Sequence, residues 1–129
     1  FIELAKKELM LENLHPICDR VENFDTSKRG FFDIAVSRAV APLNIILEYA
    51  IPFIKKDGWF VAYKSKNSAE EIQNAQNALK ILECEVADII RYDLPLDEDY
   101  TRELVVIKKK NNSPAKYPRK TQTIKKSPL

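Results

Sequence analysis

Apolar residues recur every three or four positions in three segments of the chain, a spacing that places them on one face of a helix. These segments are residues 1–12, 42–56 and 68–82. Pro52 falls late in the second segment, where we expect it to kink or end the helix. The third segment begins with Ser68-Ala69-Glu70-Glu71, which predicts a capping box between the Ser68 hydroxyl and the Glu71 carboxylate.

Runs rich in β-branched and aromatic residues predict five strands. They are residues 15–18, 32–36, 59–63, 85–94 and 102–109. Only the connection from Pro95 to Thr101 separates the last two strands. So short a connection cannot cross over to a parallel neighbour, and these strands must pair antiparallel if they lie side by side.

The order of these elements predicts an α/β fold with a mostly parallel sheet and a terminal antiparallel hairpin. This arrangement fits the C-terminal portion of a Rossmann-like class I methyltransferase domain better than a dinucleotide dehydrogenase, whose sheets are normally all parallel. We expect this domain to occupy residues 1–110, followed by a basic, proline-containing C-terminal arm over residues 111–129. The prolines are expected to keep that arm extended and free of helix.

Polar residues follow three of the predicted strands, and parallel strands would bring them to one edge of the sheet. These sets are Arg20-Val21-Glu22, Ser37-Arg38 and Lys64-Ser65-Lys66. Glu22 could accept hydrogen bonds from an adenine amine or a ribose, Arg38 could pair with a carboxylate, and Lys64 could hold a phosphate. The alternative interpretation is that these residues are ordinary charged loop residues.

The charge is divided unevenly along the chain. Residues 1–107 carry 13 Lys and Arg against 19 Asp and Glu, whereas residues 108–129 carry 8 Lys and Arg and no acidic residue. Such a block favours RNA binding, in which the cations neutralise phosphates and Tyr117 stacks on an unpaired base. A solubilising tail is the alternative.

The remaining composition argues against several classes of protein. One histidine and two cysteines without CxxC spacing make a metal site improbable, and we expect Cys18 and Cys84 to be buried, reduced thiols. No apolar run approaches the ~20 residues of a membrane span, and the charged first residues do not form a secretory signal, so we expect a cytoplasmic protein. The two glycines lie outside any GxG pattern, so no cofactor-cradling loop can be identified, and no nucleophile elbow is present.

Three stretches together resemble the ribosomal RNA small-subunit methyltransferase G family, also called glucose-inhibited division protein B. They are Ser37-Arg38-Ala39-Val40-Ala41-Pro42-Leu43, Lys116-Tyr117-Pro118-Arg119-Lys120 and Ile124-Lys125-Lys126-Ser127-Pro128-Leu129. The similarity runs from the first residue to the last without a large gap. It implies a bacterial, cytoplasmic and monomeric enzyme that transfers a methyl group from S-adenosylmethionine to N7 of a guanine in small-subunit ribosomal RNA.

The resemblance also assigns residues by position. It implies that Val21 and Glu22 contact the adenosine of the cofactor and that Arg38 binds the cofactor. Its substrate-side residues would be Lys64, Tyr117, Arg119 and Lys120. No catalytic residue and no metal are implied. The family's glycine-rich loop lies upstream of the matching region, so we expect this chain to be the C-terminal part of such an enzyme and inactive alone.

Two other functions compete with this interpretation. The chain could be a non-catalytic RNA-binding module whose sheet is only a scaffold for the basic tail. It could also be a fragment of a dinucleotide oxidoreductase, which would require all-parallel final strands and an upstream GxGxxG motif.

Overall fold

The computed structural model describes residues 1–65, 68–94 and 97–129, and for residues 22, 94 and 97–100 it describes the backbone alone. The elements in chain order are α1 (Ile2–Glu8), η1 (Val21–Asn23), η2 (Thr26–Lys28), β1 (Phe32–Arg38), α2 (Leu43–Ala50), η3 (Ile51–Phe53), β2 (Ile54–Ser65), α3 (Ser68–Asn74), α4 (Gln76–Ile81), β3 (Cys84–Leu94), β4 (Asp97–Lys109) and α5 (Thr121–Lys126). No helix within these described ranges is long and apolar enough to cross a bilayer.

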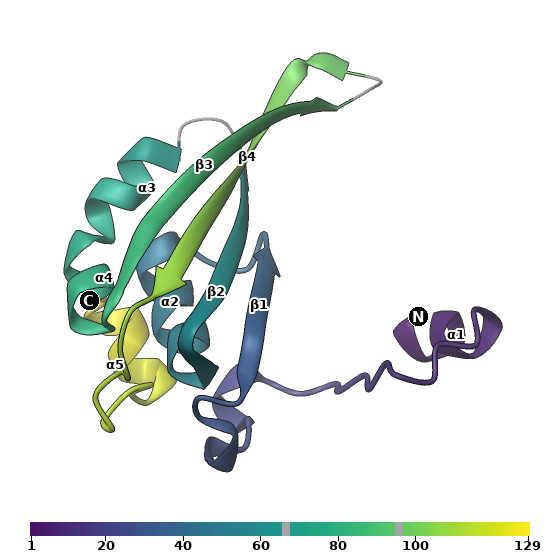
Figure 1. Ribbon diagram of the computed structural model, residues 1–129, viewed down its shortest axis with the longest axis horizontal. Helices are drawn as coiled ribbons and strands as arrows, with labels where there is room; N and C mark the ends of the chain where they lie inside the picture. The colour runs from purple at the N-terminus through teal and green to yellow at the C-terminus, as the bar shows by residue number, and fades with distance from the viewer. Residues whose placement is uncertain (66–67, 95–96) are drawn as a thin grey trace.

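The four strands form one sheet in the order β1-β2-β4-β3 (Figure 1). β1 pairs parallel with β2, while β4 pairs antiparallel with both β2 and β3. Three strands therefore point the same way, and only β4 is reversed. This confirms the predicted α/β sheet with its terminal antiparallel hairpin, and it adds that the last strand in sequence inserts between β2 and β3.

Helices α2, α3, α4 and α5 lie on one side of this sheet (Figure 1). Alternate strand residues point toward them, because side chains alternate between the two faces of a strand. Phe60 and Ala62 of β2 and Val105 and Ile107 of β4 are almost fully buried in the resulting core. On the opposite face Trp59 remains 36% exposed. In the described part of the chain no helix covers that face.

The predicted helices are present, with changes at their ends. α2 stops at Ala50, and the apolar sequence continues as the short 3₁₀ turn η3, in which Pro52 lacks the amide hydrogen that a continuing helix needs. The predicted helix over residues 68–82 is divided at Ala75 into α3 and α4. Ala75 itself is fully buried, as the sequence pattern predicted.

The N-terminal segment differs from the prediction. Residues 15–18 do not form the predicted strand, and they pair with none of the strands of the described sheet, which begins at β1. α1 has no buried residue and lies apart from the sheet at the end of an extended segment (Figure 1). Cys18 is therefore exposed, contrary to expectation, whereas Cys84 is buried as expected.

Candidate functional site

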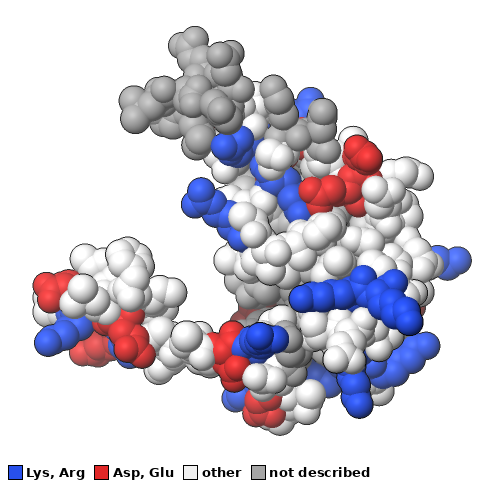
Figure 2. All heavy atoms as spheres, turned by 180° about the vertical axis from the view of Figure 1, so that it is seen from behind, with Lys and Arg blue, Asp and Glu red and all other residues white. Residues whose placement is uncertain are grey.

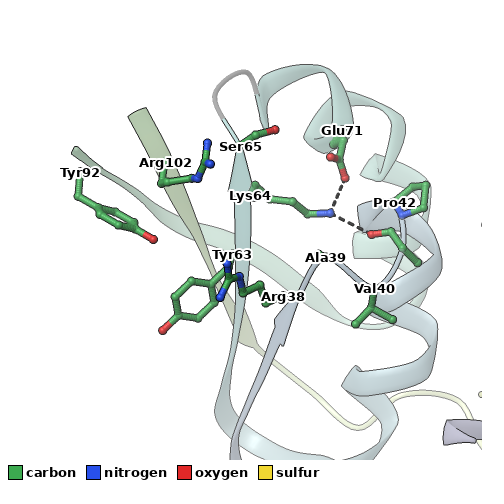
Figure 3. Close-up of a pocket in the computed structure, with 11 residues that line it drawn as sticks. Arg38, Ala39, Val40, Pro42, Tyr63, Lys64, Ser65, Glu71, Tyr92 and Arg102 are labelled. Atoms are coloured by element: carbon green, nitrogen blue, oxygen red, sulfur yellow. Dashed lines mark hydrogen bonds and ion pairs between the residues drawn. The ribbon is translucent and has the colours of Figure 1, made fainter. Parts of the chain in front are cut away.

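A cleft of about 670 Å³ opens where β1 and β2 end. Its lining comes from the β1–α2 loop and from the near ends of β2, β3, β4 and α3. Carboxyl ends of parallel strands are the usual ligand-binding edge of an α/β sheet, and the volume lies in the range of small-molecule sites. The cleft is therefore the candidate functional site, and Figure 3 shows its residues.

Arg38 is the last residue of β1 and lies opposite Tyr63 in the register of the two strands. Its side chain is exposed and reaches from the end of β1 toward Tyr63 (Figure 3). The guanidinium makes no hydrogen bond or ion pair with another described residue. Arg38 thus presents an available fork of donors to the cleft, the geometry that suits a carboxylate.

Lys64 also lines the cleft, but its ammonium group is engaged within the protein. Lys64 Nζ donates to Glu71 Oε2 at 2.6 Å and to the Ala41 carbonyl at 3.0 Å (Figure 3). The same Glu71 oxygen accepts a hydrogen bond from the Leu43 amide at 2.8 Å. The sequence correctly placed Lys64 at the same edge as Arg38, and the structure shows that Lys64 fastens the β1–α2 loop to α3.

This network replaces the predicted capping box. The Glu71 carboxylate reaches across to α2 and not back to its own helix, and the Ser68 hydroxyl is buried without a partner in the described residues. The Ser68 amide instead donates to Glu103 Oε2 at 2.8 Å. This hydrogen bond, together with the one from Arg91 Nε to Glu103 Oε1 at 2.9 Å, lowers the pKa of the Glu103 carboxyl below its ordinary value. The capping-box prediction was wrong because the Glu71 carboxylate and the Ser68 amide found partners distant in sequence.

The loop that Lys64 and Glu71 hold has an unusual backbone. Ala39 has φ of +52°, a left-handed conformation that residues with a Cβ rarely adopt. The turn directs the chain from the end of β1 into α2, so Arg38 and the backbone of residues 39–42 face the cleft together.

Two aromatic side chains that sequence reasoning missed also line the cleft. Tyr63 of β2 is 41% exposed, and Tyr92 of β3 is partly exposed. Figure 3 shows both rings on the side of the sheet away from the helices. A sequence pattern could have found Tyr63, because it follows Trp59 and Val61 at the strand period of two on the face opposite the core. Tyr92 could be placed in the cleft only from the register in which β3 pairs with β4, which the sequence does not give.

Val21 does not join this cleft. Its 3₁₀ turn leads to Phe24, whose ring lies 5.3 Å from that of Phe53 and 5.9 Å from that of Phe32, so this segment sits at the amino ends of β1 and β2. Arg38 is at the other end of β1. The Glu22 side chain lies outside the described residues. The prediction of one shared rim is confirmed for Arg38 and Lys64, whereas the structure places Val21 elsewhere because the strand that would carry it is not formed.

The C-terminal residues also differ from their predicted arrangement. Tyr117 is 4% exposed and Ile124 is fully buried, and both belong to the core cluster. Arg119 donates to both carboxylate oxygens of Glu48, at 2.8 and 2.7 Å. The prediction of an extended arm was wrong, because α5 forms and packs on the domain. Tyr117 cannot stack on a base from this position, while Lys120 is exposed as expected.

The fold matches that of solved methyltransferases. A Burkholderia thailandensis 1,6-didemethyltoxoflavin-N1-methyltransferase with bound S-adenosylhomocysteine aligns with 84% of this chain and 56% of its own, at a TM-score of 0.63 and 12% identity. A Catenulisporales acidiphilia 16S rRNA (adenine(1408)-N(1))-methyltransferase variant aligns with 74% of this chain and 58% of its own, at a TM-score of 0.51 and 12% identity. At this identity the likeness defines the fold class alone, that of Rossmann-like methyltransferases.

Sequence relatives narrow the assignment. The family model of rRNA small subunit methyltransferase G matches residues 1–97. Relatives named "Ribosomal RNA small subunit methyltransferase G" are 44% identical in Thermoanaerobacter sp. (strain X514), 40% in Clostridium botulinum (strain Okra / Type B1) and 39% in Bacillus licheniformis, each over 131 residues. The chain belongs to this family. Each match covers 100% of the chain and 54% of the relative, so the chain spans about half the length of these relatives.

Proposed function

We propose that this chain is the C-terminal part of an S-adenosylmethionine-dependent methyltransferase that acts on N7 of a guanine in small-subunit ribosomal RNA. Membership of the rRNA small subunit methyltransferase G family supports the reaction class. The observation that carries the proposal is the unpaired Arg38 guanidinium at the carboxyl edge of a methyltransferase fold. This substrate would place the enzyme in the bacterial cytoplasm.

The chemistry of the cleft fits one end of the cofactor. S-adenosylmethionine carries an amino-acid carboxylate, which the available donors of Arg38 could bind in a forked geometry. The described residues that line the cleft include one acid, Glu71, and its Oε2 oxygen is occupied by Lys64 and Leu43. The site therefore offers a net positive face to an anionic group.

The adenosine would be held by Val21 and Glu22. This assignment requires residues 15–22 to form a parallel strand of the complete sheet that is separated from β1 by other strands, because the short connection over residues 23–31 cannot cross over to a directly neighbouring parallel strand. Such a strand would bring Glu22 to the carboxyl edge, because parallel strands end on the same side.

When bound, S-adenosylmethionine supplies a methyl group attached to a positively charged sulfur. Guanine N7 has an available lone pair, so the chain need not supply a general base. Arg38 and the backbone of residues 39–42 would fix the orientation of the reactants, and the walls formed by Tyr63 and Tyr92 would exclude water. Alignment of this kind contributes up to ~7–11 kcal/mol to catalysis in favourable cases.

Calorimetry on the full-length enzyme tests the role of Arg38. Arg38→Ala should weaken cofactor binding by roughly 10- to 100-fold, since a charge-assisted hydrogen bond is worth about 1.5–3 kcal/mol. Lys56→Ala is the matched control, because it removes an exposed cation from the distant end of β2. Equal cofactor affinity in Arg38→Ala and the wild type would refute the assignment.

A further inference from the structure

Glu71 is the one acid among the described residues that line the cleft. The Leu43 amide and the Lys64 ammonium group both donate to its Oε2 oxygen, at 2.8 and 2.6 Å. No described residue donates to the other carboxylate oxygen, Oε1. The Glu71 side chain is 38% exposed, so a ligand in the cleft can reach it. One oxygen is thus used within the protein, and the other is an unused acceptor at the wall of the cleft.

The position of this acceptor is fixed by the neighbours of Glu71. Its carboxylate points from α3 toward Lys64 and the β1–α2 loop (Figure 3). Lys64 also donates to the Ala41 carbonyl, so neither side chain can swing away without losing hydrogen bonds. Acidic atoms lie among basic ones in the upper part of the molecule, where α3 lies (Figure 2). An acceptor that is held in this way loses little entropy when a ligand binds.

The chemistry of a carboxylate limits what this oxygen can bind. An ionised carboxylate accepts hydrogen bonds and donates none, so its ligand must present N–H or O–H groups. Guanine presents two N–H groups on its Watson–Crick edge, at N1 and at the 2-amino group, whereas N7 lies on the opposite edge. Proteins read unpaired bases of RNA through these edges. A guanine whose N7 faces the reactive methyl group therefore leaves its Watson–Crick edge free to meet an acceptor in the cleft.

We propose that Glu71 selects guanine as the target base, with Oε1 accepting hydrogen bonds from the N1 hydrogen and the 2-amino group. The inference rests on the proposed function, because the cleft is taken to hold the base beside the cofactor. Adenine in the same place would turn the lone pair of its N1 toward the carboxylate and leave Oε1 unsatisfied, which costs free energy. A site that hydrogen-bonds a substrate group rejects analogues without that group more strongly than an apolar pocket does.

Replacement of the target guanosine by inosine, which lacks only the 2-amino group, tests the proposal in the full-length enzyme. The guanosine of small-subunit ribosomal RNA that the wild type methylates is changed to inosine, and kcat/KM is measured for both RNAs. The wild type should favour guanosine by roughly 10- to 100-fold, since a hydrogen bond to a charged group is lost. Glu71→Ala should methylate the two RNAs with nearly equal kcat/KM, because the acceptor is gone. A role in folding alone would lower both values and keep their ratio.

Arg38→Ala is the matched control, because it removes a charged side chain from the same cleft and leaves Glu71 in place. It should lower kcat/KM for both RNAs by one factor, so that the preference for guanosine stays that of the wild type. A wild type that methylates both RNAs equally would overturn the inference and leave the proposed function intact, and this result does not depend on the folding of any variant.

The affinity of Glu71→Ala for the cofactor, measured by calorimetry, separates the remaining outcomes. A variant that keeps the preference for guanosine and binds the cofactor more weakly would overturn the inference, because the Oε1 oxygen would then serve the amino group of the cofactor. A wild type that methylates no guanine at N7 would refute the proposed function, and the inference with it.

Discussion

Lys64 illustrates how tertiary contacts decide the role of a single residue. It lies at the predicted edge, yet its side chain is only 12% exposed and its donors serve Glu71 and Ala41. A cation with these partners positions the β1–α2 loop and is not available to a phosphate. The charged residue that the cleft leaves available is Arg38, one strand away.

A double-mutant cycle on Lys64→Met and Glu71→Gln tests this positioning role. Each single change should lower the free energy of unfolding by about 1–3 kcal/mol, because a partly buried partner is left unsatisfied. The free energy of unfolding of the double variant should fall by less than the sum of the two single losses, since both changes break the same network. Urea denaturation gives the coupling energy, and strict additivity would contradict the network.

Lys109, at the end of β4, is another lysine whose side chain is held inside the protein. Its side chain is 2% exposed, and Nζ donates to the carbonyl groups of Ile51 at 2.9 Å and Ile54 at 2.5 Å. Burial lowers the Lys109 pKa from 10.5 to about 8, helped by the nearby charge of Arg29. Burial also raises the pKa of the neighbouring Cys84 thiol from 9.0 to about 12.

These pKa values predict a pH dependence of stability with a definite sign. Between pH 8 and pH 10.5 the unfolded state binds more protons at Lys109 than the folded state, so the free energy of unfolding rises with pH. Cys84 acts in the opposite direction above pH 9, which leaves pH 8–9 as the informative window. From pH 8 to pH 9, the free energy of unfolding of the wild type should rise by about 1 kcal/mol more than that of Lys109→Met, as measured by urea denaturation. If the stability of the wild type and that of Lys109→Met changed equally with pH, Lys109 could not be the cause of the pH dependence.

At the level of an element, tertiary contacts also override the local sequence pattern in the C-terminal segment. Its prolines and lysines predict an exposed, extended arm, because local sequence contains no strong helix signal. The structure instead forms α5, since Ile124 finds an apolar site and Arg119 finds the fully buried carboxylate of Glu48. Tertiary burial here outweighs local preference.

Removing the buried partner of Arg119 should release this segment. Glu48→Gln is expected to lower the free energy of unfolding by about 3 kcal/mol, because one member of a buried ion pair is lost. Glu85→Gln is the control, since its pair with Lys110 is exposed and should change stability by less than about 1 kcal/mol. Faster tryptic cleavage at Lys120 and Lys125 in Glu48→Gln alone would show release. Equal cleavage in both variants would count against it.

On the scale of the molecule, the described residues leave the sheet with one face covered by helices and one open face. Helices cover the side of Phe60 and Ile107, while Ile34, Val36 and Trp59 remain exposed on the other side, at 56%, 65% and 36%. An apolar sheet face of this kind is normally buried by another layer. The relatives are about twice as long as this chain, which supplies the length for such a layer.

Fluorescence quenching of Trp59 tests this whole-molecule organisation. In the 129-residue chain alone, acrylamide should quench Trp59 strongly, because its side chain is partly open to solvent. In the full-length enzyme the quenching constant should fall severalfold as the face becomes covered. Subtracting the signal of Trp59→Phe isolates this residue, and equal constants in both proteins would refute the second layer.

The sequence by itself determined the four strands of the sheet and the helical segments over residues 42–56 and 68–82, because the period of the apolar positions and the short 95–101 connection fix the strands, the buried helix faces and the antiparallel hairpin. It also placed Arg38 and Lys64 at one edge. It wrongly predicted a strand over residues 15–18 and missed α5. Only the tertiary structure decided which of the two cations stays available, where β4 inserts and that the basic tail packs on the core. Those outcomes depend on partners distant in sequence, such as Glu71 for Lys64 and Glu48 for Arg119, which local patterns do not encode.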